Sequence, residues 1–277
     1  MTLLLNGFEL AKTRRAELAE RVRKLPRSPK LAVILVGNDP ASAIYVKNKE
    51  KAAVEAGIES VVYRLENITQ TELLALIAEL NADKGVDGIL IQLPLPRDLN
   101  EREILQAVDP AKDVDGFHPL NLGKLMIGEP APVACTPKGC MELIHQANRN
   151  LAGLRAVVIG RSLIVGKPME QLLLREDCTV TTAHSKTENL PDLCRTADIL
   201  VAAVGKPKIV KPDWIKDGAI VIDVGINRLP DGKLCGDADF DACFDKCAAI
   251  TPVPKGVGPM TIAMLMENTV EAYQRKL

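Results

Sequence analysis

The chain has 277 residues, of which 47% are hydrophobic and only 3% aromatic, and its formal net charge is −1. The near-neutral charge gives no electrostatic reason to expect nucleic acid or a membrane surface as a partner. A core of aliphatic residues and alanine favours helix-covered parallel sheets over a β-sandwich. The length allows one large domain or two of medium size.

The seven cysteines and the N-terminal residues bear on the cellular compartment. No two cysteines form a Cys-x-x-Cys pair, which argues against a disulfide framework and for a reducing environment. Cys243 and Cys247 are spaced to share a helical face, but no histidine lies near them, so no metal site is predicted. The first residues lack a basic segment, and no charge-free window has membrane-spanning length. We therefore expect a cytoplasmic protein without a membrane partner.

Strand and helix signals alternate through the first half of the chain. Asp39 followed by Pro40 predicts the start of a helix, and Gly57 predicts its end. Helices are expected over residues 8–25, 40–56, 71–81 and 100–108, and strands over residues 31–36, 60–65 and 88–93. Residues 109–137 contain several Pro and Gly and little periodicity, so they predict a long loop that is functional or joins two domains.

The same alternation restarts in the second half. A helix is expected over residues 137–148, followed by strands over 155–159, 178–183, 198–203 and 219–223 with helical stretches between them. Residues 251–259 are rich in proline and glycine and precede a final helix to about residue 275. The chain therefore predicts an α/β fold of two lobes, each a mainly parallel sheet with flanking helices. The second lobe is expected to be Rossmann-like, with a cleft between the lobes.

A glycine turn follows the strand expected at residues 155–159. Gly160 comes directly after the apolar run, and Gly166 and Pro168 stand at the expected start of a helix. Such a turn can bring a phosphate to backbone N–H groups at a helix N-terminus. Because the usual three-glycine pattern is incomplete, this stretch alone is equally compatible with an ordinary strand-to-helix turn.

The end of the next strand indicates which nucleotide is bound. In an NAD-binding unit a carboxylate normally follows the second strand and holds the ribose 2′-OH. Here that strand ends in His184-Ser185-Lys186 without a carboxylate, and Arg161 directly follows Gly160. A cation and a hydroxyl suit a 2′-phosphate, so NADP is predicted over NAD, although in isolation Arg161 and His184 also fit solvated turn positions. Residues 203–207 and 223–227 are expected to border the nucleotide.

Candidate catalytic residues come from the first half. Tyr45 and Lys49 are four residues apart and share one helical face, whereas Lys51 lies on another. A lysine held in a cleft can transfer protons, and a neighbouring ring can stack on a flat substrate, but an exposed helical lysine is usually only solvated. Gln92 ends an apolar strand, where it can hydrogen-bond a neutral lysine or satisfy loop backbone.

The segment from Lys112 to Pro119 carries two carboxylates two residues apart, Asp113 and Asp115. One is expected to turn the chain through a local hydrogen bond to backbone. The other is expected to face the cleft and bind a pair of N–H groups on a heterocycle. Asp113 with His118 also suggests a metal, although closely spaced loop carboxylates more often make turns.

Together these segments resemble the bifunctional methylenetetrahydrofolate dehydrogenase/cyclohydrolase family over essentially the whole chain. Seven motifs in this order and spacing carry the resemblance. They are Tyr45-Val46-x-x-Lys49-x-Lys51, Asp87-Gly88-Ile89-x-x-Gln92-Leu93-Pro94-Leu95-Pro96, Lys112-Asp113-Val114-Asp115-Gly116-Phe117-His118-Pro119, Cys135-Thr136-Pro137, Gly160-Arg161-Ser162-x-x-Val165-Gly166-x-Pro168, Asp223-Val224-Gly225-Ile226-Asn227 and Thr251-Pro252-Val253-Pro254-x-Gly256-Val257-Gly258-Pro259-Met260-Thr261.

The resemblance implies two coupled reactions of one-carbon metabolism. A hydride leaves 5,10-methylenetetrahydrofolate for NADP, and water then opens the resulting methenyl compound to 10-formyltetrahydrofolate. By resemblance, Lys49 is the catalytic lysine, Gln92 tunes it and Asp115 holds the pterin. Tyr45 stacks on the folate, and the proline-rich loop adds substrate contacts from Pro254 and Gly258. The resemblance includes no metal.

The resemblance also implies the cofactor contacts and the domain organisation. Arg161 and Ser185 match contacts to the 2′-phosphate, and Gly160, Ser162 and Ile226 match other cofactor contacts. Residues 1–138 plus 259–277 are expected to form the folate-binding catalytic lobe. Residues 139–258 are expected to form the NADP-binding Rossmann-like lobe. A homodimer and a link to purine biosynthesis complete the implied properties.

Two residues depart from the family pattern. Leu163 stands where the family usually has Asn, and Lys255 stands where it usually has Gly. These departures bear on substrate and cofactor affinity more than on reaction type. Two alternatives remain, a monofunctional NADP-dependent methylenetetrahydrofolate dehydrogenase and a catalytically silent folate-binding protein.

Overall fold

The computed structural model describes residues 1–277, and the chain folds into two compact units. The three-stranded unit contains residues 12–135 and 262–277, and the six-stranded unit contains residues 1–11 and 136–261. The sequence placed residues 1–138 plus 259–277 in one lobe, so the two divisions differ mainly in the first eleven residues. Those residues include strand β1 (Leu3–Leu4), which pairs in parallel with β11 (Ala249–Ile250) of the six-stranded unit.

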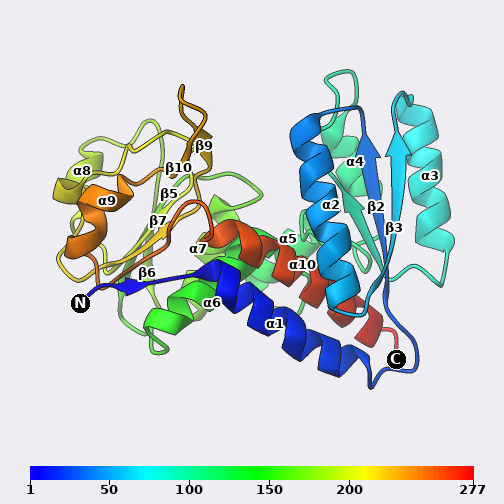
Figure 1. Cartoon of the computed structure of the whole chain (residues 1–277), viewed down its shortest axis with the longest axis horizontal. Helices are drawn as coiled ribbons and strands as arrows, with labels where there is room; N and C mark the ends of the chain where they lie inside the picture. Colours follow the sequence, from blue (N-terminus) through cyan, green and yellow to red (C-terminus); the bar gives the residue numbers. More distant parts are fainter. The chain divides into compact units, whose positions relative to one another are not determined.

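A parallel sheet in the order β3-β2-β4 forms the core of the three-stranded unit (Figure 1). Its strands are β2 (Lys30–Val36), β3 (Glu59–Leu65) and β4 (Gly88–Ile91). Every residue of β2 after Lys30 is buried, as expected for a central strand covered on both faces. The parallel pairing brings the carboxyl ends of all three strands to one edge of the sheet.

Helices surround this sheet. Ile34 of β2 packs in one apolar cluster with Leu73 and Ile77, which lie on α3. The helices that belong wholly to this unit are α2 (Pro40–Glu55), α3 (Gln70–Ala82), α4 (Glu101–Ala107) and α5 (Pro119–Ile127). Helices α1 (Gly7–Val22) and α10 (Val257–Gln274) contribute residues to both units.

Helix α5 lies inside residues 109–137, so the prediction of one long loop is wrong there. Pro119 occupies the first turn, and His118 Nδ1 accepts a hydrogen bond from the Leu120 N–H at 3.1 Å. The helix ends at Gly128, which has φ +82°. Both end signals are present in the sequence, but nine residues are too few for a helical period to stand out among the flanking prolines and glycines.

A buried ionic cluster fastens the C-terminal residues to the start of β4. Asp87 is fully buried and accepts two hydrogen bonds from Arg27, at 2.7 and 2.9 Å, and one from Lys276 at 3.0 Å. Burial opposes ionisation of Asp87, but the bonds from Arg27 and from the Lys30 N–H outweigh it and lower the pKa of the carboxyl. The cluster thereby holds residues 262–277 in the three-stranded unit.

The six-stranded unit has a fully parallel sheet in the order β1-β11-β8-β7-β5-β6. Its longer strands are β5 (Arg155–Ile159), β6 (Thr179–Ala183), β7 (Ile199–Ala202) and β8 (Ile220–Asp223). The chain passes from β5 to β6 on one side and then to β7 on the other. The carboxyl ends of β5 and β7 therefore form the switch point at which doubly wound sheets bind ligands.

Shorter elements complete this unit. The two-residue strands were not predicted, because so few residues show no period. The remaining elements are the helices α6 (Cys135–Ala147), α7 (Gly166–Arg175), α8 (Leu190–Cys194) and α9 (Phe240–Cys243), the 3₁₀ turns Pro212–Trp214 and Phe244–Lys246, and an antiparallel hairpin of β9 (Asn227–Arg228) and β10 (Leu234–Cys235). None of the helices combines the length and apolar character that a membrane span needs.

Candidate active site

Helix α2 presents Tyr45 and Lys49 from one face. The helix begins at Pro40, and the Asp39 carboxylate caps it by accepting a hydrogen bond from the Ser42 N–H at 2.7 Å. Tyr45 is 42% exposed and is therefore accessible from solvent. Lys49 is half-buried one turn further on, whereas Lys51 is exposed. The cap therefore fixes the start of the helix that carries both predicted residues.

Lys49 and Gln92 are hydrogen-bonded to each other. The Lys49 ammonium donates to Gln92 Oε1 at 2.9 Å, and Gln92 Nε2 donates to the Leu93 carbonyl at 2.6 Å. Gln92 is only 8% exposed and follows the last residue of β4. Because its N–H group is committed to the Leu93 carbonyl, the amide oxygen is directed at Lys49. Gln92 therefore hydrogen-bonds both Lys49 and loop backbone.

The two carboxylates after Lys112 have different environments. Asp113 accepts hydrogen bonds from the N–H groups of Gly116 at 3.0 Å and His118 at 2.8 Å, and from Asn121 Nδ2 at 2.9 Å. Asp113 is therefore the carboxylate that turns the chain. His118 is used to cap α5, so neither side chain is directed to a metal. No group of three or more His, Cys, Asp or Glu side chains is arranged to hold a metal ion.

Asp115 is the other carboxylate of this segment, and its environment differs from that of Asp113. Burial raises its pKa to about 7, and the negative charge of Asp113 adds to the rise while Lys49 opposes it. A carboxylate of this kind gains from a ligand that donates N–H groups to it. Gly116, which follows, has φ +73°, and a Cβ there would lie 2.5 Å from the Ala134 nitrogen, so only glycine fits the turn that places Asp115.

The glycine turn after β5 is packed against the protein's own backbone. Gly160 has φ +125°, and a Cβ there would lie 2.4 Å from the Ala203 carbonyl oxygen. A Cβ on Gly166 would lie 2.1 Å from the Gly160 carbonyl oxygen. Both glycines are therefore required by the close approach of β5, the start of α7 and the loop after β7, whatever ligand is bound.

The sequence predicts that N–H groups at the start of α7 are available to a phosphate, but in the structure they are bonded to Ser162. Ser162 Oγ accepts from the N–H groups of Val165 at 3.1 Å and Gly166 at 3.4 Å, and the Ser162 carbonyl accepts from Lys167 at 3.0 Å. The first N–H groups of α7 are thus already satisfied. In contrast, the N–H groups of residues 161–164 donate to no protein atom. A phosphate would find its backbone donors in this loop, before the helix begins.

Arg161 and Ser185 stand at matching positions. In the parallel pairing of β5 and β6, Ile159 is opposite Ala183, and each predicted residue lies two positions beyond that pair. Both side chains are exposed. His184 Nδ1 accepts from the Lys186 N–H at 3.2 Å, so this histidine shapes the turn after β6. The structure therefore places a free guanidinium and a free hydroxyl at neighbouring strand ends.

Ile226 and Gly258 lie beside each other in the six-stranded unit. The Ile226 side chain is 49% exposed, and a Cβ on Gly258 would lie 3.9 Å from Ile226 Cδ1. Pro254 lies in the loop between β11 and α10 that also contains Lys255. Lys255 has φ +79°, a conformation that glycine adopts without steric cost. Lys255 therefore holds a backbone angle that suits glycine better than lysine.

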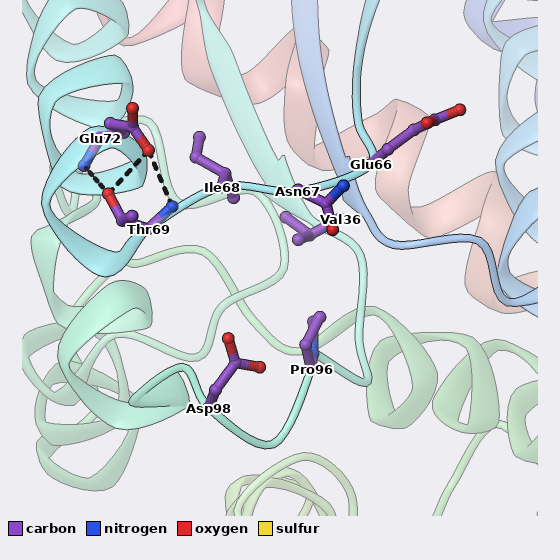
Figure 2. A pocket seen from close by; sticks show the side chains of 8 residues that line it. All are labelled: Val36, Glu66, Asn67, Ile68, Thr69, Glu72, Pro96 and Asp98. Atoms are coloured by element: carbon purple, nitrogen blue, oxygen red, sulfur yellow. Dashed lines mark hydrogen bonds between the residues drawn. The ribbon is translucent and has the colours of Figure 1, made fainter.

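One cavity of the three-stranded unit does not lie at these residues. It holds about 470 Å³ and opens at the carboxyl ends of β2 and β3 (Figure 2). Figure 2 shows Thr69 and Glu72 bonded to each other as the capping box of α3, with Glu66 directed away from them. Its lining residues are Val36, Glu66, Asn67, Ile68, Thr69, Glu72, Pro96 and Asp98. None of the predicted site residues lines it, and we assign it no ligand.

Comparison with known proteins defines the class. Residues 5–115 match the catalytic domain of the tetrahydrofolate dehydrogenase/cyclohydrolase family, and residues 134–277 match the NAD(P)-binding domain of the same family. The two-domain α/β fold and these matches define a dehydrogenase with a nicotinamide nucleotide domain. The chain belongs to the tetrahydrofolate dehydrogenase/cyclohydrolase family.

Individual relatives agree over nearly the whole length. The bifunctional FolD protein of Geobacillus thermodenitrificans is 56% identical over 276 residues, which cover 98% of this chain and 97% of the relative. The crystal structure of the FolD methylenetetrahydrofolate dehydrogenase/cyclohydrolase of Campylobacter jejuni has a TM-score of 0.98 and 49% identity, with 100% of both chains covered. The Trypanosoma brucei enzyme, solved with NADP and an inhibitor, has a TM-score of 0.93 and 38% identity, with 99% and 98% covered.

These matches confirm the predicted family, the α/β fold class and NADP as the cofactor. They also confirm an enzyme that oxidises 5,10-methylenetetrahydrofolate and hydrolyses the methenyl product to 10-formyltetrahydrofolate. The two alternatives, a monofunctional dehydrogenase and a silent folate-binding protein, are not supported by relatives that are bifunctional at this identity.

Proposed function

We propose that the residues predicted from the sequence carry out these two reactions, with the folate chemistry in the three-stranded unit and NADP in the six-stranded unit. The observation that carries the proposal is the 2.9 Å hydrogen bond from the Lys49 ammonium to Gln92, whose amide is itself fixed by the Leu93 carbonyl. The functional boundaries proposed from the sequence, 1–138 plus 259–277 and 139–258, remain a proposal.

The folate is held by residues around this pair. The exposed ring of Tyr45 stacks on the flat part of the substrate, one turn from Lys49. Asp115, which has no cation bonded to it, accepts hydrogen bonds from the pterin N–H groups. Pro254 and Gly258 are the further substrate contacts implied by the resemblance, and Gly258 adjoins Ile226.

The exposed cation and hydroxyl at the ends of β5 and β6 fit a 2′-phosphate. Arg161 and Ser185 supply a charge-assisted and a neutral hydrogen bond to it. Gly160, Ser162 and Ile226 border the rest of the nucleotide, and the free N–H groups of residues 161–164 face its phosphates. When bound, NADP accepts the hydride from the one-carbon bridge.

Lys49 acts on water in the second reaction. The methenyl carbon is already electrophilic, so no nucleophilic side chain is needed, and a general base that directs water is enough. A protonated lysine would repel the cationic substrate, and Gln92 Oε1 accepts a hydrogen bond from the neutral amine as well. Gln92 therefore keeps the Lys49 side chain directed at the substrate.

Replacement of Lys49 tests the assignment. Lys49→Met should lower the hydrolysis rate of methenyltetrahydrofolate about 1,000-fold, because the positioned base is lost. Binding of NADP should stay within twofold of wild type. Lys51→Met, which changes an exposed lysine two residues away, is the matched control and should retain both activities. Hydrolysis by Lys49→Met at the wild-type rate would refute the role of Lys49.

We also propose that the enzyme works as a cytoplasmic homodimer that supplies one-carbon units to purine biosynthesis. All seven cysteines are free and buried, which suits a reducing compartment. Light scattering on the purified protein would test the dimer, since one chain has a mass of 30.0 kDa. A mass of one chain at micromolar concentration would overturn it.

A further inference from the structure

Asp237 is a buried carboxylate that none of the assigned roles uses. It is fully buried, and its carboxylate forms no ion pair with a Lys or Arg side chain. Asp237 Oδ2 accepts from the N–H groups of Val204 at 2.7 Å and Gly205 at 3.0 Å. Asp237 Oδ1 accepts from the Lys206 N–H at 2.8 Å and from Asn227 Nδ2 at 2.9 Å. Four donors therefore converge on one internal anion.

A second carboxylate, Asp223, ties the same region from the end of β8. Asp223 Oδ1 accepts from the N–H groups of Gly225 at 3.0 Å and Asp237 at 2.8 Å, and Oδ2 accepts from Ala238 at 2.8 Å. The glycine of the 223–227 motif makes room for this arrangement, because a Cβ on Gly225 would lie 2.2 Å from Asp237 Oδ1. The chain after β10 is thereby bonded to the chain after β8.

The segments joined by Asp237 are those that border the proposed cofactor site. Val204 to Lys206 lie in the loop after β7. Ala203, the first residue of that loop, is in close contact with Gly160. Asn227 follows Ile226, the residue proposed to contact the nucleotide. Three successive N–H groups pointing at one anion would suit a phosphate, but here the carboxylate of Asp237 takes that place. The N–H groups of the loop after β7 are therefore used by Asp237, and the loop contributes only its surface to the proposed cofactor site.

We propose that Asp237 is a positioning residue for NADP, and this inference rests on the proposed cofactor site. Its carboxylate holds the loops after β7 and β8 in the conformation that places Val204–Lys206 and Ile226 against the nucleotide. An asparagine has one accepting and one donating end, so it cannot satisfy four donors. Asp237→Asn must turn an NH₂ group toward two of them, and the loops then separate.

The two activities of the enzyme separate this role from a loss of stability. Asp237→Asn should raise the KM and the dissociation constant for NADP at least tenfold. Hydrolysis of supplied methenyltetrahydrofolate, measured without cofactor, should stay within twofold of wild type. Asp239→Asn is the matched control, because Asp239 lies two residues further on and its carboxylate binds only Lys208 and Lys211. NADP affinity like that of wild type in folded Asp237→Asn would overturn the inference.

A second, milder variant tests the inference if Asp237→Asn does not fold. Asn227→Ala removes one of the four donors and leaves the carboxylate in place, so it should raise the dissociation constant for NADP about threefold. If Asp237→Asn is unfolded and Asn227→Ala binds NADP normally, the inference is wrong. Arg161→Ala distinguishes this from failure of the proposed function. If Arg161→Ala also leaves NADP binding unchanged, the cofactor site itself is misplaced, whereas a large effect of Arg161→Ala confines the failure to Asp237.

Discussion

The polar side chains at the carboxyl ends of the two sheets differ in their bonding partners. At the edge of the three-stranded sheet, Lys49 donates a hydrogen bond to Gln92, and the nearby Asp115 lacks a bonded cation. At the edge of the six-stranded sheet, Asp223 and Asp237 are buried and bonded to backbone N–H groups. The carboxylates of the six-stranded unit are bonded to backbone, whereas in the proposed function Asp115 of the three-stranded unit binds the substrate. Under that proposal the same residue type binds a ligand in one unit and fixes backbone conformation in the other.

The largest effect expected in a test of this contrast is at the nucleotide edge. Arg161→Ala should raise the KM for NADP about 30-fold, since a hydrogen bond to a charged group contributes about 2 kcal/mol. The KM for NAD, which lacks the 2′-phosphate, should hardly change. Steady-state kinetics with both nucleotides measure the difference. Arg228→Ala, at an exposed arginine bonded to the Gly232 carbonyl, is the control. Equal losses for NAD and NADP would remove the 2′-phosphate assignment.

A smaller effect is expected from pH at the folate edge. Because the pKa of Asp115 is raised to about 7, the carboxyl is largely protonated at pH 6 and ionised at pH 8. The KM for the folate should therefore fall up to tenfold as pH rises through 7. In Asp115→Asn the KM for the folate should be high and independent of pH. Asp98→Asn, which changes an exposed carboxylate, is the control and should keep the pH dependence of wild type. A wild-type profile in Asp115→Asn would contradict the role of Asp115.

The same shift sets the sign of a stability effect. The folded pKa of Asp115 lies above that of the unfolded chain, so the folded state keeps its proton longer. The raised pKa therefore adds to the free energy of unfolding fully below about pH 4, and this addition is lost as pH rises through about 7. Thermal unfolding of wild type should therefore show a decline between these pH values that is shallower in Asp115→Asn.

The smallest effect is expected at Lys255. Its φ of +79° is costly for a side chain with a Cβ, and glycine relieves that cost while losing more entropy on folding. Lys255→Gly should change the free energy of unfolding by about +0.5 kcal/mol, measured by urea titration. Lys246→Gly, in a 3₁₀ turn, should instead be destabilising. A loss of stability in Lys255→Gly would show that the lysine side chain contributes contacts that outweigh its backbone strain.

The sequence predicted what local patterns encode. Apolar runs located the strands of four or more residues in both sheets within about two residues, and the Asp39-Pro40 pair located the start of α2. The strand-end position of Gln92 and the spacing of Tyr45 and Lys49 were enough to indicate a site. The two carboxylates after Lys112 remained open, because burial and the partners of Asp113 are decided by the tertiary fold.

What the sequence missed depends on residues far apart in the chain. Asp237 accepts hydrogen bonds from three N–H groups more than 30 residues away in the chain, so no local spacing in the sequence indicates its role. Its one local signal is a glycine before it, Gly236, where a Cβ would lie 1.8 Å from Asp223 Oδ2. The placement of free N–H groups in residues 161–164 was missed because the serine that satisfies the helix start was interpreted only as a cofactor contact.

The order of segments along the chain has a consequence for biosynthesis. The three-stranded unit requires residues 262–277, in which Asn268 donates to the carbonyls of Val114 and Val133 and Lys276 donates to Asp87. During translation this unit therefore has its sheet but not its closing helix until residues 262–277 have been made. A nascent chain stalled before residue 262 would expose the apolar surface that α10 covers and would become a substrate for chaperones.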